Sequence, residues 1–173
     1  MQHRLPLKIF IKKCSTNLNN LEPIINKCLF SSRDLLAIVP ASTIISELQI
    51  KSAIEKSYNS LFSNRPISKS LSIEFLLFLY ATRKISEALS TVAKKDKYFF
   101  VVVASGSKER AARSLRCIYA SGFKNAEFKL KPNVKKLAKL YKITWLDAYK
   151  GFPREKALEL AVIEKQALLR LSE

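Results

Sequence analysis

Apolar and polar residues alternate with a period of two in two segments, and this alternation is typical of half-buried strands. The segments are LKIFI at residues 7–11 and AEFKLK at residues 126–131. LLAIVP at residues 35–40 predicts a short apolar strand that ends at Pro40, which has no N–H to donate. KYFFVVVA at residues 97–104 is apolar after its first residue, which predicts a central strand covered on both faces.

Other segments repeat their apolar residues with the helical period. A short helix is predicted within residues 17–30, and Ser42 or Thr43 is expected to cap the next one. A helix within residues 105–123 should end at Gly122, a shorter one should begin at Pro132, and the last should cover residues 154–171. Strands separated by an excess of helices predict a mixed α/β (α+β) fold. We expect one domain over residues 1–173, with a small mixed sheet, a central helical block and a long C-terminal helix.

The stretch LSIEFLLFLYATRKISEAL at residues 71–89 combines an apolar run with two adjacent cations. The pattern predicts a buried helix, a break at Ala81–Thr82 and a second helix from about Lys84 to residue 93. Arg83 and Lys84 therefore lie at the joint between two helices. They form either a solvated turn or a basic corner held rigidly for a polyanion.

The charge balance favours the second interpretation. The chain has 31 Lys and Arg against 14 Asp and Glu, which gives a formal charge of +17 over 173 residues. Such a domain usually meets nucleic acid, although an anionic membrane or an acidic protein would also fit. Further cations are Arg65 and Lys69 in the predicted loop 62–70, and Arg110 and Arg113 on the polar face of the helix that ends before Gly122.

The sequence offers little for catalysis. His3 is the only histidine, which removes a His-based triad and most metal sites, so we expect no catalytic residue, no metal and no cofactor. The SGSK turn at residues 105–108 could cradle a phosphate, but its single glycine favours an ordinary turn. The three cysteines are scattered, so we expect buried free thiols rather than a disulfide scaffold. No signal peptide or membrane span is apparent, and we expect a cytoplasmic protein.

The last predicted helix has an apolar surface wider than one core contact requires. One face holds Ala157, Leu158, Ala161, Val162, Leu168 and Leu169. A second, adjacent face holds Leu160, Ile163, Ala167 and Leu171. The helix is either buried deep in the fold, or its second face binds a protein partner.

Three segments together resemble a known family. ISKSLSIEFLLFLYATRKISEALSTVA, the strand YFFVVVAS and the C-terminal ALELAVIEKQALLRL are similar to the small accessory subunit of the KEOPS complex, of the PRPK-binding protein family and of archaeal type. The resemblance covers the chain from about Leu36 onward, and it is sharpest at residues 71–89, with Glu74 in the first helix. The common archaeal corner is Arg-Gln-Ile, so Lys84 is a departure that adds charge.

The resemblance implies a mixed α/β domain without enzymatic activity. Such a subunit binds and stimulates the small kinase-like ATPase subunit of KEOPS, and archaeal members also hold tRNA, including its single-stranded 3′ end. The complex makes N6-threonylcarbamoyladenosine, with the chemistry in another subunit. On this basis Arg65, Lys69, Arg83, Lys84, Arg110 and Arg113 are expected to line one tRNA-binding surface. The alternatives are another basic RNA-binding or ribosome-associated protein, and an enzyme that uses the SGSK turn for a nucleotide.

Overall fold

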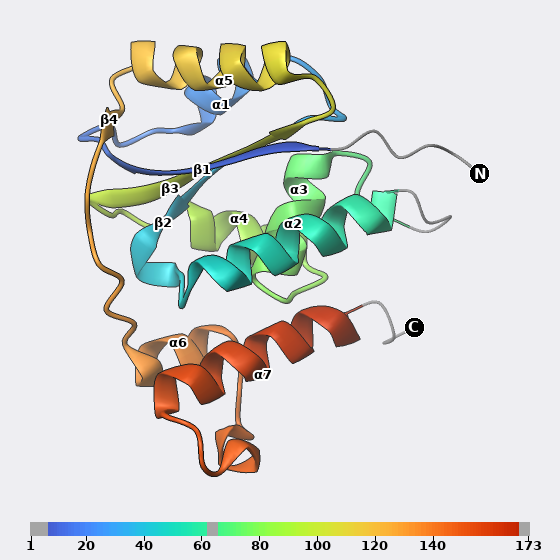
Figure 1. Cartoon of the computed structure of the whole chain (residues 1–173), viewed down its shortest axis with the longest axis vertical. Helices are drawn as coiled ribbons and strands as arrows, with labels where there is room; N and C mark the ends of the chain where they lie inside the picture. Colours follow the sequence, from blue (N-terminus) through green and yellow to red (C-terminus); the bar gives the residue numbers. More distant parts are fainter. Residues whose placement is uncertain (1–6, 62–65, 170–173) are drawn as a thin grey trace. The chain divides into compact units, whose positions relative to one another are not determined.

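The computed structural model describes residues 7–61 and 66–169, and these form a mixed α/β fold (Figure 1). The elements, in chain order, are β1 (Lys8–Ser15), α1 (Glu22–Cys28), β2 (Leu35–Pro40), α2 (Glu47–Leu61), α3 (Leu71–Leu79), α4 (Ile85–Val92), β3 (Tyr98–Ser105), α5 (Lys108–Ala120), β4 (Lys124–Asn125), α6 (Val134–Leu140) and α7 (Arg154–Leu168). The fold class is therefore confirmed. The chain divides into two compact units, so the single domain stays a prediction.

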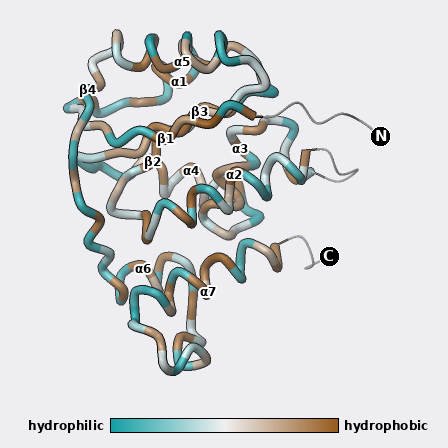
Figure 2. Tube along the Cα trace, in the orientation of Figure 1, coloured by the Kyte–Doolittle hydropathy of each residue, from teal (hydrophilic) through white to brown (hydrophobic). Residues whose placement is uncertain are grey.

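The first unit comprises Met1–Ala41, Ser70–Ser72 and Val92–Phe128, and it contains the whole sheet. The strand order is β2-β3-β1-β4, and each pairing is antiparallel, whereas we expected a mixed sheet. β3 occupies an inner position, as predicted, and every residue from Phe99 to Ser105 is buried. Figure 2 shows this strand as a continuous hydrophobic stretch, because both of its faces are covered.

Helices α1 and α5 cover one face of this sheet (Figure 1). Phe99, Val101 and Val103 pack there against Ala111 and Ile118 of α5. Across α1 and α5, Cys28 and Cys117 form a disulfide with a Cα–Cα distance of 5.5 Å, and the Ser114 hydroxyl donates to the Cys28 carbonyl at 2.9 Å. The expectation of free thiols is thus wrong for this pair. The two cysteines are 89 residues apart, and only the packing of α1 on α5 brings them together. Cys14 remains free and buried.

The segment AEFKLK is not a strand, although its alternation predicted one. Pairing with β1 stops at Asn125, after which Ala126 N–H donates to the Lys13 carbonyl at 2.9 Å. Phe128 instead lays its ring against Tyr98, with ring centroids 5.1 Å apart. The alternation therefore reflects a half-buried extended segment without a partner strand.

The second unit comprises Ser42–Lys69, Ile73–Thr91 and Lys129–Glu173. It holds α2, most of α3 and α4, and the pair α6 and α7. The predicted break after the apolar run is confirmed, since α3 ends at Leu79 and α4 begins at Ile85. The predicted start of α2 is wrong, because residues 41–43 form a 3-10 turn and the helix begins at Glu47. The Ser46 hydroxyl accepts from Gln49 N–H at 3.2 Å and so caps α2. Within the described residues, no helix is long and apolar enough to cross a membrane.

Candidate nucleic-acid interface

A pocket of about 260 Å³ lies within the second unit, between the α3–α4 corner and the facing ends of α6 and α7. Its lining combines cations with aromatic and apolar groups. The residues are Tyr80, Ala81, Thr82, Arg83, Lys84, Glu87, Thr91, Leu140, Tyr141, Lys142, Lys165 and Leu169. Both cations of the sequence-predicted corner, Arg83 and Lys84, therefore line this pocket, and both side chains are exposed.

The corner has a fixed backbone conformation. Thr82 N–H donates to the Leu77 carbonyl at 3.0 Å and Ala81 N–H to the Phe78 carbonyl at 3.1 Å, which are the two bonds of a Schellman motif at the end of α3. This motif requires a left-handed residue, and Ala81 adopts it with φ 48°. Arg83 and Lys84 come directly after this motif, so its hydrogen bonds set the position of the backbone from which both side chains extend.

The end of α6 repeats the same arrangement on the other side of the pocket. Ile143 N–H donates to the Ala138 carbonyl at 2.9 Å and Lys142 N–H to the Lys139 carbonyl at 3.2 Å. Here Lys142 is the left-handed residue, with φ 53°. Within residues 7–61 and 66–169, Ala81 and Lys142 are the two non-glycine residues with positive φ, and both line the pocket. Each costs roughly 1–2 kcal/mol relative to right-handed backbone, and backbone strain of this kind clusters at functional sites.

Glu87 is the one carboxylate among the lining residues, and it contacts two of the cations, Lys84 and Lys142. Glu87 accepts from the Thr82 hydroxyl at 2.9 Å, and Lys142 Nζ lies 3.1 Å from both of its oxygens. Lys84 Nζ lies 3.6 Å from Glu87 Oε1. The hydrogen bond from Thr82, followed by that from Lys142, lowers the pKa of Glu87. The lining contains one carboxylate, Glu87, and four cations, Arg83, Lys84, Lys142 and Lys165. Its formal charge is therefore 4 − 1 = +3.

Lys165 of α7 adds a partly buried cation to the pocket. Its Nζ donates to the Tyr141 carbonyl at 2.7 Å. Burial, together with the nearby charge of Lys142, lowers the pKa of Lys165. An anion placed between Lys142 and Lys165 would relieve their repulsion, so the arrangement favours a negatively charged ligand.

Beneath the pocket, a buried hydrogen-bond network fixes the two tyrosines. Tyr141 O–H donates to the Thr43 carbonyl at 2.7 Å and accepts a hydrogen bond from Gln49 Nε2. Tyr80 O–H shares a hydrogen bond of 3.1 Å with the Thr43 hydroxyl. Tyr80 is 6% exposed, so it packs rather than offering its ring to a base. Burial raises the pKa of both tyrosine hydroxyls, which stay neutral donors and acceptors.

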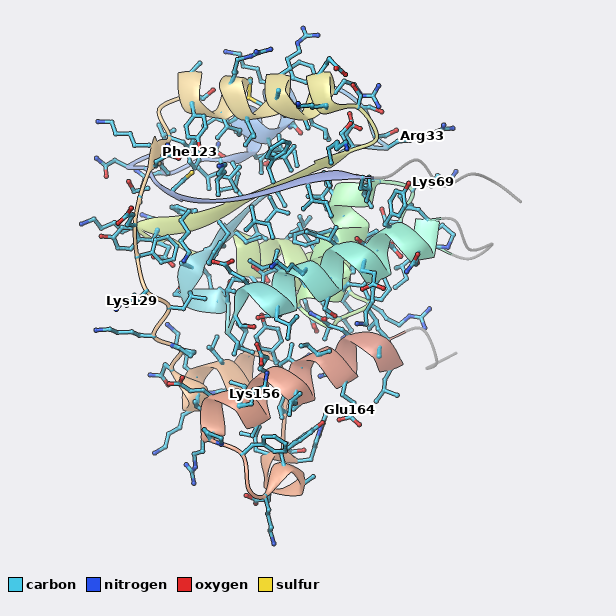
Figure 3. The ribbon with its side chains drawn as sticks, viewed as in Figure 1. Arg33, Lys69, Phe123, Lys129, Lys156 and Glu164 are labelled. Carbon is cyan, nitrogen blue, oxygen red and sulfur yellow. A yellow bond between two sulfur atoms is a disulfide. The ribbon has the colours of Figure 1, made fainter. Side chains whose placement is uncertain are left out.

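Lys69 lies on a loop that a buried carboxylate anchors (Figure 3). Glu74 of α3, with 0% exposure, accepts from Ser68 N–H at 2.8 Å and from the Ser60 hydroxyl at 2.6 Å. The side chain of Lys69 is exposed next to this anchored residue. Arg65 lies outside the described residues.

Arg110 and Arg113 belong to the first unit, on the exposed face of α5. Arg110 Nε donates to Asp34 Oδ2 at 2.8 Å, and this contact with a carboxylate raises the pKa of the guanidinium. Arg113 lies over the ring of Phe30, 4.2 Å from its centroid. Both therefore already have an intramolecular partner, and a surface shared with the corner stays a prediction.

The predicted protein-binding face of α7 is only partly covered. Leu160 and Ile163 are half-buried and Ala167 is exposed, while Leu171 lies outside the described residues. On the other face, Ala157, Leu158, Ala161 and Val162 are buried, as expected. Leu168, expected on that inner face, is 47% exposed and extends the uncovered apolar surface.

Sequence reasoning missed Lys142 and Lys165, which face the corner across the pocket. Neither stands near Arg83 in the chain, so no local pattern connects them. A usable signal was the density of lysines around Lys142, because residues 129–143 contain six lysines and no acidic residue. Within the described ranges, no group of three or more His, Cys, Asp and Glu side chains could hold a metal ion.

The model of the family described as kinase binding protein CGI-121 matches residues 15–170. A search of curated proteins gave no match.

Proposed function

Because the chain belongs to the kinase binding protein CGI-121 family, which its match over residues 15–170 shows, we propose that it is an accessory subunit of the KEOPS complex. In this proposal it binds and stimulates the small kinase-like ATPase subunit and recruits tRNA for N6-threonylcarbamoyladenosine formation. It performs no chemistry itself, and it acts in the cytoplasm. The Cys28–Cys117 disulfide is compatible with that location in hyperthermophiles, whose intracellular proteins are often disulfide-rich.

The observation that supports tRNA binding is the pocket. It lies between the C-terminal ends of two helices, each of which is followed by a residue with left-handed backbone, Ala81 or Lys142. Four cations line it beside a single carboxylate, and they come from segments far apart in the chain; two of them, Lys84 and Lys142, contact Glu87. A phosphate-bearing ligand would neutralise the surplus charge, and an arginine such as Arg83 can donate two hydrogen bonds to one phosphate. The formal charge of +17 would accelerate the encounter with a polyanion of any sequence.

We assign the kinase partner to the second apolar face of α7, which holds Leu160, Ile163 and Ala167 within the described residues. Leu171, predicted for the same face, lies outside them. Half-buried and exposed apolar side chains on one helix face suit a protein interface better than a solvated surface. Exposed Leu168 lies beside this face and enlarges it.

The test of tRNA binding is affinity measured across a salt series. Arg83→Ala should weaken binding and lower the slope of log K against log salt by about one unit. Arg83→Glu with Lys84→Glu should nearly abolish binding, because repulsion replaces attraction. The matched control is Lys94→Glu with Lys95→Glu, another adjacent and exposed pair outside the pocket. Equal affinities for the two double variants would reject the pocket as the tRNA site.

The kinase assignment is tested by binding to the purified kinase-like subunit. Ile163→Glu should weaken this binding by upwards of about 2 kcal/mol, since buried interface positions tolerate charge poorly. Ala167→Glu provides a second variant at an exposed position, where folding should be unaffected. Leu48→Glu on α2, at an apolar side chain 48% exposed, is the control. If both α7 variants bind like the control, the partner surface lies elsewhere.

A further inference from the structure

Six exposed lysines lie close together along the chain in the second unit, within residues 129–142. They are Lys129, Lys131, Lys135, Lys136, Lys139 and Lys142, and we call them the lysine track. No acidic residue interrupts residues 129–143. Figure 3 shows Lys129 on the extended segment that leads to α6. The formal charge of this short segment is therefore +6, more than a third of the net charge of the chain.

The backbone presents these lysines in two ways. Exposed and half-buried residues alternate from Lys129 to Asn133, so Lys129 and Lys131 lie on the same side of an extended segment. On α6, Lys135, Lys136 and Lys139 fall within about 100° of the helix circumference. Leu137, on the other side of α6, is 1% exposed. The helix thus buries an apolar anchor and turns an entirely cationic face outward.

This arrangement is unfavourable for the helix on its own. Lys135 and Lys136 occupy the first turn of α6, where the helix dipole favours acidic side chains, and none is present there. Lys135 and Lys139 are like charges separated by four residues, which destabilises a helix. Within the described ranges, the side chains of Lys135, Lys136 and Lys139 form no ion pair that would offset these costs. A bound polyanion would reverse each unfavourable term.

We propose that the lysine track is a second contact surface for RNA, along which the phosphate backbone runs to the pocket. The track ends inside the pocket, because Leu140, Tyr141 and Lys142 line it. One long polyanion can therefore occupy both surfaces. An anionic membrane fits less well, since the exposed positions of α6 are lysines and its apolar Leu137 is buried. This inference rests on the proposed RNA-binding function and adds a site to it.

The test compares two triple variants of equal net charge. The track variant carries Lys135→Gln, Lys136→Gln and Lys139→Gln, and the control carries Lys51→Gln, Lys94→Gln and Lys95→Gln at exposed positions elsewhere. Each has 28 − 14 = +14 formal charges. If each track lysine contacts one phosphate, the salt slope of tRNA binding should fall by about two to three units and affinity by roughly 10- to 100-fold near 0.1 M salt. The control should retain the wild-type slope.

A single substitution separates binding from stability. Asn133 caps α6 by accepting from Lys136 N–H at 3.0 Å, so Lys136→Glu places an acid where a capping box and the helix dipole both favour it. The variant should melt at a higher temperature than the wild type and yet bind tRNA more weakly. If Lys136 instead served only to stabilise the fold, the substitution would lower the melting temperature and the tRNA affinity together.

The outcomes are distinguishable. Equal losses in the two triple variants would mean that only total charge matters, and they would overturn the track while leaving the pocket intact. A track variant that loses binding to phosphatidylserine vesicles but not to tRNA would overturn it in favour of a membrane. If the wild type does not bind tRNA at all, the proposed tRNA function falls and the track falls with it.

Discussion

Loss of the Cys28–Cys117 disulfide should destabilise the protein more than most single substitutions would. The bond closes a segment with a sequence separation of 89 residues. In the chain-entropy account, a loop of that length restricts the unfolded state by about 4 to 5 kcal/mol at 25 °C. For a chain of 173 residues, each kcal/mol corresponds to about 2–4 °C in Tm, so reduction should lower Tm by roughly 8 to 20 °C.

The assay is differential scanning calorimetry of the oxidised protein with and without a phosphine reductant. The variant Cys28→Ser with Cys117→Ser should melt near the reduced wild type and show no response to reductant. Cys14→Ala is the control, because it removes the free and buried thiol and should keep the full response. The difference between the two redox states of each variant cancels the cost of the substitution itself.

Two results would refute this reasoning. One is a Tm that does not change on reduction, which would mean that α1 and α5 hold together without the bond. The other is a count of three reactive thiols in the oxidised, denatured wild type, where the structure requires one.

Three further predictions concern the pocket and the loop beside α3. Ala81→Gly should stabilise the fold by up to about 1 kcal/mol in urea unfolding, because relief of the left-handed backbone exceeds the entropy that glycine adds to the unfolded chain; a lower urea midpoint would contradict it. Glu74→Ala should lower the free energy of unfolding by about 2 kcal/mol or more, because it leaves the Ser60 hydroxyl and the Ser68 N–H without their acceptor; Glu74→Gln should cost less because its carbonyl can still accept. The pKa of Glu87 is lowered in the folded state, so its contribution is complete above its unfolded pKa, near 4.3, and is lost as the pH falls through the folded value. Between pH 5 and pH 3, the Tm of the wild type should therefore fall more than that of Glu87→Gln, and parallel curves would show that Glu87 adds nothing.

The sequence by itself determined the elements whose signals are local. The predictions of β3, of the strand that ends at Pro40 and of the break after α3 nearly matched the observed positions. A strand buried on two faces and the end of a helix each produce a recognisable residue pattern within a few positions of the chain. The family resemblance also came from the sequence, and the kinase-binding family is confirmed by the match over residues 15–170.

Tertiary structure alone decided which distant residues meet. Cys28 and Cys117 pair only because α1 and α5 share one face of the sheet, so the expectation of free thiols failed. Alternation in AEFKLK indicates a half-buried extended segment, but it does not decide whether the segment pairs with a strand: β1 continues to Lys8, and yet pairing with β4 stops at Asn125.

The site illustrates the same division. The cations at Arg83 and Lys84 stand out in the sequence, and the turn that carries them follows from the end of an apolar helix. Lys142, just after α6, and Lys165 of α7 complete the pocket from more than 50 residues further along, and no spacing rule links them to the corner. Charge is a property of each residue and can be read from the chain, whereas a field of converging charges depends on distances that only the packed helices set.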